Sequence, residues 1–203
     1  MRKLIVALLA TLLLGRGASA YSTTYRGPDA GYLVFSVGYV ERALEVVFRF
    51  RKPGAKEDFW ADCRLHYNAS PLLRTPLDYQ GHESGAVRVY TLEPGEYEIF
   101  SWETSTGGVT GPEDYYSRPF SLKFTIRPGE TTYIGTYEIV PTFQVGPGGW
   151  LNGSPFYFVI ADRHERDLPI AQKKEPKLPM PAVVQVPDVS GLSAYLLQPV
   201  LGD

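Results

Sequence analysis

Between residues 31 and 162, apolar and polar side chains alternate in short runs that are separated by turn residues. In residues 44–51, for example, Leu44, Val46, Phe48 and Phe50 share one side of a period of two. This period is typical of β-strands that bury one face. The sequence therefore predicts an all-β fold with almost no helix. The eight strands that we expect are 31–39, 44–51, 59–67, 86–92, 97–103, 120–126, 131–140 and 155–161.

Two Pro-Gly pairs each stand between consecutive predicted strands. Pro94-Gly95 precedes the strand 97–103, and Pro128-Gly129 precedes the strand 131–140. Proline fixes φ near −65° and glycine accepts a positive φ, which together suit a type II turn. We therefore predict a β-hairpin at each pair, with both glycines at positive φ.

The sequences around these turns resemble those of a known family. The stretches VYTLEPGEYEIFSW (89–102) and FTIRPGETTYIGTYEI (124–139) resemble the last hairpins of transthyretin-like, carboxypeptidase-regulatory-like β-sandwich domains. They are closer still to an uncharacterised bacterial envelope domain that is often found in lipoproteins. The resemblance implies an antiparallel β-sandwich of seven or eight strands over residues 31–162, and it brings no catalytic residues.

The N-terminal 20 residues have the order of an export signal. Arg2 and Lys3 precede an apolar run at 4–14, and Ala18-Ser19-Ala20 ends the segment. We predict cleavage after Ala20, which leaves a lead at 21–30. Tyr21 stands where a bacterial lipoprotein would carry its lipidated cysteine, and no later apolar run approaches the 20 residues needed to span a bilayer. We therefore expect a periplasmic or secreted protein without a membrane span.

Charge and cysteine content narrow the function classes further. Loss of the three signal cations would change the formal net charge from −2 to −5, which disfavours nucleic acid as a partner. Cys63 is the only cysteine, so no intrachain disulfide is possible. Its alternation with Ala61 and Leu65 predicts that Cys63 is buried in the core.

No metal or catalytic constellation is evident. Cys63 and His66 are three residues apart, and this odd spacing places them on opposite faces of a strand. The sequence has no Gly-x-Ser-x-Gly elbow and no phosphate-binding loop followed by a helix. Glu113-Asp114 fit a solvated turn as well as they fit acid–base chemistry. We predict a protein without enzyme activity, with no catalytic residue, no metal site and no cofactor.

Long connections are expected at 68–85, 104–118 and 141–153, and two of them carry aromatic residues. Trp150 lies in a glycine-rich stretch, and Tyr115 and Tyr116 lie in the 104–118 connection. Aromatic side chains on loops can stack on sugar rings or anchor a partner. These three residues are the predicted contacts to a ligand or partner. For Trp150 the sequence favours the alternative, in which its side chain folds back over the end of the sandwich and closes the core.

The region after the last strand has a different composition. Residues 163–203 hold 6 of the 17 prolines. Asp162 and Glu165 resemble a capping pair, but Pro169 limits the predicted helix to little more than one turn. From about Lys173 we predict an irregular, Pro-rich tail outside the sandwich core. Its apolar residues, such as Val183 and Val184, favour docking, either on an edge of its own sheet or on a partner.

These observations predict an exported, non-enzymatic β-sandwich that acts by binding or by structural support in the cell envelope. Its partner would be an envelope protein or a glycan that the sequence does not identify. Two alternatives remain open: a carbohydrate-recognition module that uses the loop aromatics, and an envelope hydrolase that depends on carboxylates.

Overall fold

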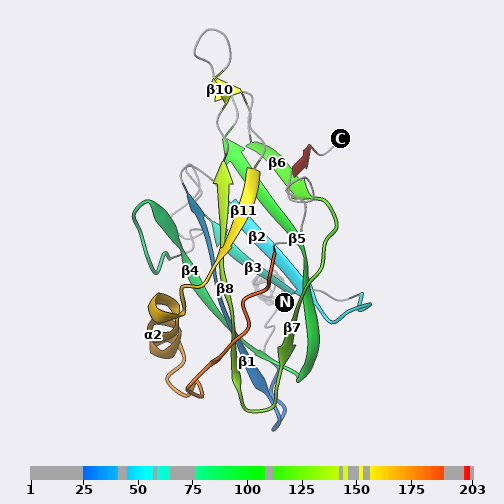
Figure 1. Ribbon diagram of the computed structural model, residues 1–203, viewed down its shortest axis with the longest axis vertical. Coiled ribbons are helices and arrows are strands. Elements are labelled where there is room, and N and C mark those ends of the chain that lie inside the picture. The colour runs from blue at the N-terminus through cyan, green and yellow to red at the C-terminus, as the bar shows by residue number, and fades with distance from the viewer. Residues whose placement is uncertain are drawn as a thin grey trace, which may run out of the picture.

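Two β-sheets account for most of the residues that the computed structural model describes (Figure 1). The described residues are 25–40, 45–56, 59–64, 76–107, 112–141, 144–145, 151–152, 156–189 and 199–201. Four strands of sheet I pair side by side, and a fifth, short strand pairs with the second of them. In this order they are β11 (Phe156–Ala161), β8 (Thr131–Pro141), β1 (Gly31–Val40) and β4 (Glu83–Leu92), with β12 (Val183–Val184) beside β8.

Sheet II packs against one face of sheet I, and a separate two-stranded ribbon extends from one end of the molecule (Figure 1). The strands of sheet II are, in spatial order, β13 (Pro199–Leu201), β6 (Pro112–Ser117), β5 (Gly95–Gly107), β2 (Glu45–Arg51) and β3 (Phe59–Arg64), with β7 (Leu122–Ile126) also paired to β5. The ribbon consists of β9 (Gln144–Val145) and β10 (Leu151–Asn152).

The predicted all-β sandwich is confirmed, and each of the eight predicted strands has a counterpart. The expected loop at 104–118 is wrong, because β5 continues to Gly107 and β6 pairs with it. Most pairings are antiparallel, but β1 and β8 pair in parallel, as do β12 and β8. No helix of the described segments has the length and apolar character required to cross a bilayer.

The Pro-Gly pairs do not form hairpins, and that prediction is wrong. β4 pairs with β1 in sheet I, whereas β5 belongs to sheet II, so the chain crosses between the sheets at Pro94-Gly95. The same crossing, in the other direction, joins β7 to β8 at Pro128-Gly129. Both glycines do have positive φ, +146° at Gly95 and +67° at Gly129. The Pro-Gly pair determines only the local turn. The apolar faces of the flanking strands decide whether these strands pair within one sheet or lie in two facing sheets.

The main core lies between the sheets and is rich in aromatic rings. Phe35 of sheet I meets Phe50 of sheet II edge to face, with ring centroids 6.0 Å apart, and Phe48 lies 5.1 Å from Tyr137. Trp102 is fully buried and meets Phe158 edge to face. Such offset and edge-to-face arrangements are the favoured geometries for aromatic pairs.

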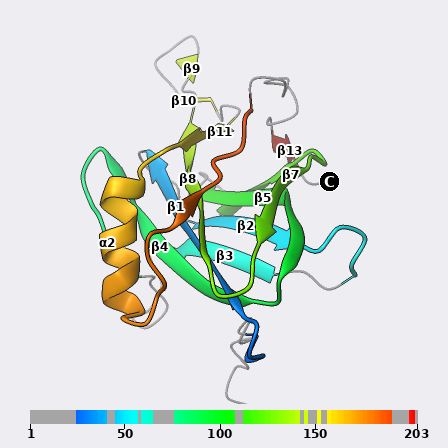
Figure 2. The ribbon, with the colours of Figure 1, turned by 60° about the horizontal axis from the view of Figure 1, so that its bottom comes forward.

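A third layer covers the outer face of sheet I. It consists of α2 (His164–Lys174) and the segment that follows it (Figure 2). Leu168, Ala171 and Leu178 of this layer form a second apolar cluster with side chains of the sheet. The sheet contributes Val34, Val87 and Tyr133 to the cluster.

The prediction that Pro169 limits the helix to about one turn is wrong, because α2 has 11 residues with Pro169 inside. Proline removes one hydrogen bond and crowds the preceding turn, which costs about 3 kcal/mol in a helix interior. Burial of Leu168 and Ala171 and the polar contacts of Asp167, described below, oppose this cost. The N-cap residue is Arg163, without a side-chain cap, and not Asp162 as expected. Asp162 nevertheless accepts a hydrogen bond from the backbone N–H of His164, the first residue of α2, at 3.1 Å.

The segment after α2 docks on its own domain. β12 pairs with Thr132 and Tyr133, on the part of the β8 edge that β11 leaves open. The Gln185 side-chain amide bonds both backbone groups of Thr125 in β7, at 3.1 and 3.3 Å. We call residues 178–189 the strap, because they connect the edges of the two sheets (Figure 2).

Substitution of Gly129 by Val should lower the free energy of unfolding by about 1–3 kcal/mol, since a β-branched residue is strained at positive φ. No atom lies within 4 Å of a Cβ built at Gly129, so the cost would come from the backbone alone. Urea denaturation measures it. Gly129→Asn is the control and should cost less, because asparagine tolerates this conformation; an equal cost for both variants would contradict the explanation.

Removal of residues 173–203 should lower the melting temperature by about 5–10 °C, because the strap contacts are lost. A shorter deletion of 190–203 keeps the strap and should cost less. Calorimetry of both chains tests this. An unchanged melting temperature in the longer deletion would instead assign the tail to a partner, and failure to fold would make it a core element.

Candidate functional site

The most concentrated polar chemistry of the described residues lies between α2 and the outer face of sheet I. The strand register aligns the sheet residues that take part. Gly85, Gly38, Glu138 and Val159 are directly paired across the four strands β4, β1, β8 and β11. The neighbouring row of paired residues, two positions along each strand, is Val87, Ser36, Thr136 and Ala161.

Asp167 of α2 is the centre of this cluster and is fully buried. Its Oδ2 accepts hydrogen bonds from Ser36 Oγ at 2.5 Å, Thr136 Oγ1 at 2.7 Å and the Tyr133 hydroxyl at 2.8 Å. Its Oδ1 accepts a bond from Arg166 Nε at 2.8 Å. A buried carboxylate is tolerated only when it is bonded in this way, so these four contacts fix where α2 sits on the sheet.

A charged layer surrounds Asp167. Besides Asp167, the Arg166 guanidinium bonds Glu83 at 3.2 Å and Thr136 at 3.1 Å, and it lies 3.7 Å over the ring of Tyr79. Arg163 adds a second contact to Glu83, at 3.1 Å. The strand β4 and the helix α2 are therefore joined through Glu83 by two arginines.

Glu138 is the unusual member of the cluster. Only 4% of its surface is exposed, and its Oε1 has no hydrogen-bond partner among the described residues. Burial, and then the charge of Glu83, raise the pKa of Glu138 to about 7, against the opposing effects of Arg166 and Arg163. Burial also raises the pKa of the Tyr133 hydroxyl far above its ordinary value.

Two glycines make room for the Tyr79 side chain over this row. A Cβ at Gly38 would lie 2.8 Å from the Tyr79 hydroxyl oxygen, and one at Gly85 would lie 2.3 Å from it. The hydroxyl end of Tyr79 therefore lies against bare backbone, and Arg166 stacks on the ring. Larger residues at these positions would displace Tyr79 and uncover the row that contains Glu138.

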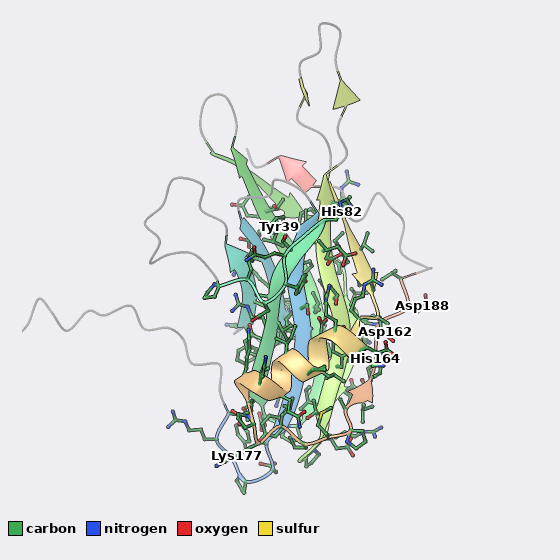
Figure 3. The ribbon with its side chains drawn as sticks, turned by 90° about the vertical axis from the view of Figure 1, so that its left-hand side faces the viewer. Tyr39, His82, Asp162, His164, Lys177 and Asp188 are labelled. Atoms are coloured by element: carbon green, nitrogen blue, oxygen red, sulfur yellow. The ribbon has the colours of Figure 1, made fainter. Side chains whose placement is uncertain are left out.

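The chemistry of this arrangement is better suited to holding a helix than to catalysis. The Ser36 hydroxyl is buried and donates to a carboxylate, whereas a nucleophilic serine needs a neighbouring base such as histidine. His164 Nδ1 is 2.7 Å from Asp162 Oδ1 at the exposed end of α2, where Figure 3 shows both residues. In the part of the chain that the structure describes, no three His, Cys, Asp or Glu residues are grouped so that they could hold a metal ion.

An open groove of about 380 Å³ lies at the other end of α2, between Lys174 and residues 87–91 of β4. Lys174 Nζ bonds the Val87 carbonyl at 2.8 Å and Asp78 at 2.5 Å, and Asp78 in turn accepts the Val87 amide at 2.7 Å. These side chains cap the outward backbone groups of an edge strand, which limits edge-to-edge association.

Of the residues predicted as ligand contacts, Tyr115 and Tyr116 belong to sheet II and lie away from this cluster. Tyr115 and Tyr116 are on β6, in a strand and not in a loop, and pair with Thr104 and Glu103 of β5. Tyr116 is 42% exposed. Trp150 and the side chain of Tyr115 lie outside the described residues.

The other polar residues weighed in the sequence are on strands of sheet II where the structure describes them. Glu113 and Asp114 are on β6, and Cys63 is on β3, where it pairs with the fully buried Val46. The side chains of these three residues, and His66 as a whole, lie outside the described residues.

The residues of the cluster around Asp167 were not predicted from the sequence. A signal for them exists in the strand patterns. Ser36 interrupts the otherwise apolar and aromatic run of β1, and Thr136 and Glu138 interrupt the run from Tyr133 to Val140 in β8. Polar residues on such strands indicate a polar contact with a covering layer, because a buried polar group needs a partner.

Comparisons with known proteins add little to this geometry. No protein-family model matches the chain, and no curated protein sequence matches it. Among solved structures, a leucine-rich repeat protein from Bacteroides thetaiotaomicron VPI-5482 is similar, with a TM-score of 0.34 and 9% sequence identity. The similarity covers 56% of this chain and 14% of that chain.

Substitution of Asp167 by Ala should lower the free energy of unfolding by about 2–4 kcal/mol, because three buried hydroxyl groups and Arg166 lose a shared partner. Glu165→Ala, an exposed acid on the same helix, is the matched control and should change stability by less than about 0.5 kcal/mol. Thermal and urea unfolding measure both. Equal effects of the two variants would show that the cluster does not anchor α2.

Proposed function

We propose that the protein is an exported, non-enzymatic β-sandwich that acts by binding or by structural support in the cell envelope. The observation that carries the proposal is the use of the polar cluster. Asp167, Ser36 and Thr136 are buried, and their bonds hold α2 to sheet I. In the described residues, the one concentrated set of acid and hydroxyl groups therefore serves to hold the helix on the sheet. This use favours a stable scaffold over a catalyst.

The sequence of the first 20 residues supports export. The scaffold has no intrachain disulfide, but it suits an oxidising compartment because it does not depend on one. Its stability comes from the aromatic core and from the third layer. The resemblance to an uncharacterised bacterial envelope domain is in keeping with this proposal, and loops held by a rigid scaffold commonly carry binding residues.

For the binding surface we propose the end of sheet II that carries Tyr115 and Tyr116, together with Trp150. Tyr116 is one of the few large apolar side chains exposed in the described residues. Exposed aromatic residues anchor protein partners and stack on sugars. An envelope protein or a glycan is therefore the proposed partner of this end.

Expression in the native host, followed by fractionation and mass spectrometry, tests export. The expected product is outside the cytoplasm and begins at Tyr21, because the basic, apolar and small-residue segments direct export and cleavage. An intact Met1 on a cytoplasmic product would overturn this part of the proposal.

A photoreactive amino acid at position 116 tests the binding surface in the same cells. A single crosslinked envelope protein, or crosslinking to the cell wall, is expected. The same probe at Val184, which is 43% exposed on the strap, is the matched control and should give neither. Identical products from both positions, or none from either, would argue against a binding role for the Tyr116 end.

A further inference from the structure

Glu138 lies where the third layer closes over sheet I, and the charged groups that face it come from both sides of that closure. Arg166 and Asp167 face it from α2, Arg163 from the N-cap position before the helix, and Glu83 from β4. The Tyr79 ring, stacked under Arg166, covers the adjacent Gly38 and Gly85. The residues that pair with Glu138 on β1 and β11 are Gly38 and Val159, which carry no charge.

The charges around Glu138 balance only when Glu138 is neutral. Two arginines then face the two carboxylates of Glu83 and Asp167. Both arginines are already bonded to those carboxylates, and Oε1 of Glu138 has no donor among the described residues. Ionised Glu138 would add a third negative charge in a buried place, which is costly unless water or a donor reaches it.

Movement of α2 is the simplest way to let water reach Glu138. The side chain projects from the middle of β8, which is paired on both sides at this point, so strand separation would break many more bonds. α2 itself makes fewer internal bonds than its length allows, because Pro169 has no N–H. The helix therefore depends on its contacts with the sheet, and the contacts nearest Glu138 are those of Arg166 and Asp167.

We propose that α2 is a proton-dependent latch on the outer face of sheet I, closed when Glu138 is protonated and opened more readily when Glu138 is ionised. Opening exposes the row of Gly38 and Glu138 and the apolar patch of Val34 and Val87. It leaves the core between the two sheets intact.

The direction of the pH effect follows from the two states. In the closed state the pKa of Glu138 is raised from its ordinary 4.5 to about 7, and in the open, hydrated state it returns toward the ordinary value. The closed state then holds a proton that the open state releases, so closure is most stable at low pH. Opening becomes easier as pH rises from about 4.5 to 7 and levels off above that.

Amide hydrogen exchange on the full mature chain tests the latch. After correction for intrinsic exchange rates, the opening constant of the α2 amides of Leu168 and residues 170–174 should rise at least about tenfold between pH 5 and pH 8. Amides of β1 and β5 serve as reporters of global unfolding and should change much less. Equal changes in all of these amides would mean global destabilisation and would overturn the latch.

Glu138→Gln is the decisive variant, because it keeps the shape of the side chain and removes the titration. Its α2 opening constant should be independent of pH over this range. Glu165→Gln is the matched control and should behave as the original chain. His164→Gln is a second control, because histidine as a class titrates near neutral pH, and it should retain the pH dependence. If Glu138→Gln retains the dependence, or His164→Gln loses it, the proposal is wrong.

A direct titration keeps the test valid if Glu138→Gln does not fold. Carbon-13 NMR of the side-chain carboxyl groups in the original chain should find the pKa of Glu138 well above the ordinary glutamate value of 4.5. A Glu138 carboxyl that titrates at the ordinary value would overturn the latch.

Discussion

β1 is buried on both of its faces, and the rest of the architecture depends on this. Every residue from Leu33 to Tyr39 is buried. One face, with Phe35 and Val37, packs in the core between the sheets, and the other, with Val34, packs under α2. Parallel strands occur almost only where both faces are covered, and β1 pairs in parallel with β8. A two-layer sandwich would leave one of these faces in water, so the third layer is a physical requirement of the sequence.

Apolar burial alone would allow α2 to slide or rotate on the sheet, because hydrophobic contact is not directional. The contacts of Asp167 are directional. Three hydroxyls, from Ser36, Thr136 and Tyr133, converge on one carboxylate oxygen and bring two strands and the helix into one register. A buried charge contributes less to stability than an apolar residue of similar size often would. Its value here is that it selects one position of α2, and the neighbouring Glu138 makes that position sensitive to protonation.

Much of the fold could be predicted from the sequence. Alternation in runs such as 44–51 located the eight main strands, because a strand with one wet face shows a period of two. In β1 the pattern is nearly continuous, and this departure from alternation is the signal for burial on both faces and for the parallel pairing with β8. The sequence analysis treated β1 as an ordinary alternating strand and so left its outer face without a cover.

The features that could not be predicted depend on contacts between distant residues. Pro-Gly specifies a turn with positive φ at glycine, and Gly129 has it, but the turn does not specify which sheet the next strand joins. Pro169 is a helix breaker by local rules, yet Asp167 and Leu168, the two residues before it, have partners more than 30 residues away in sequence. The position of Glu138 next to Arg166 likewise follows only from the pairing of β8 with β1 and from the docking of α2.

The third layer also protects the edges of sheet I, so the same layer covers both the outer face of the sheet and its edges. On the β4 edge, Lys174 from the last turn of α2 bonds the Val87 carbonyl. On the opposite side of the sheet, Gly135 of β8 lies between the end of β11 and the strap. A Cβ at Gly135 would lie 3.1 Å from Ile160 and 3.3 Å from Val186. The strap therefore continues an edge that β11 cannot complete. Because Lys174 belongs to the same helix as Asp167, release of α2 would uncover the apolar face of sheet I and free a backbone acceptor on its edge together. An exposed apolar face beside an unpaired strand is a surface on which another chain can add, and the anchoring of α2 keeps this surface covered.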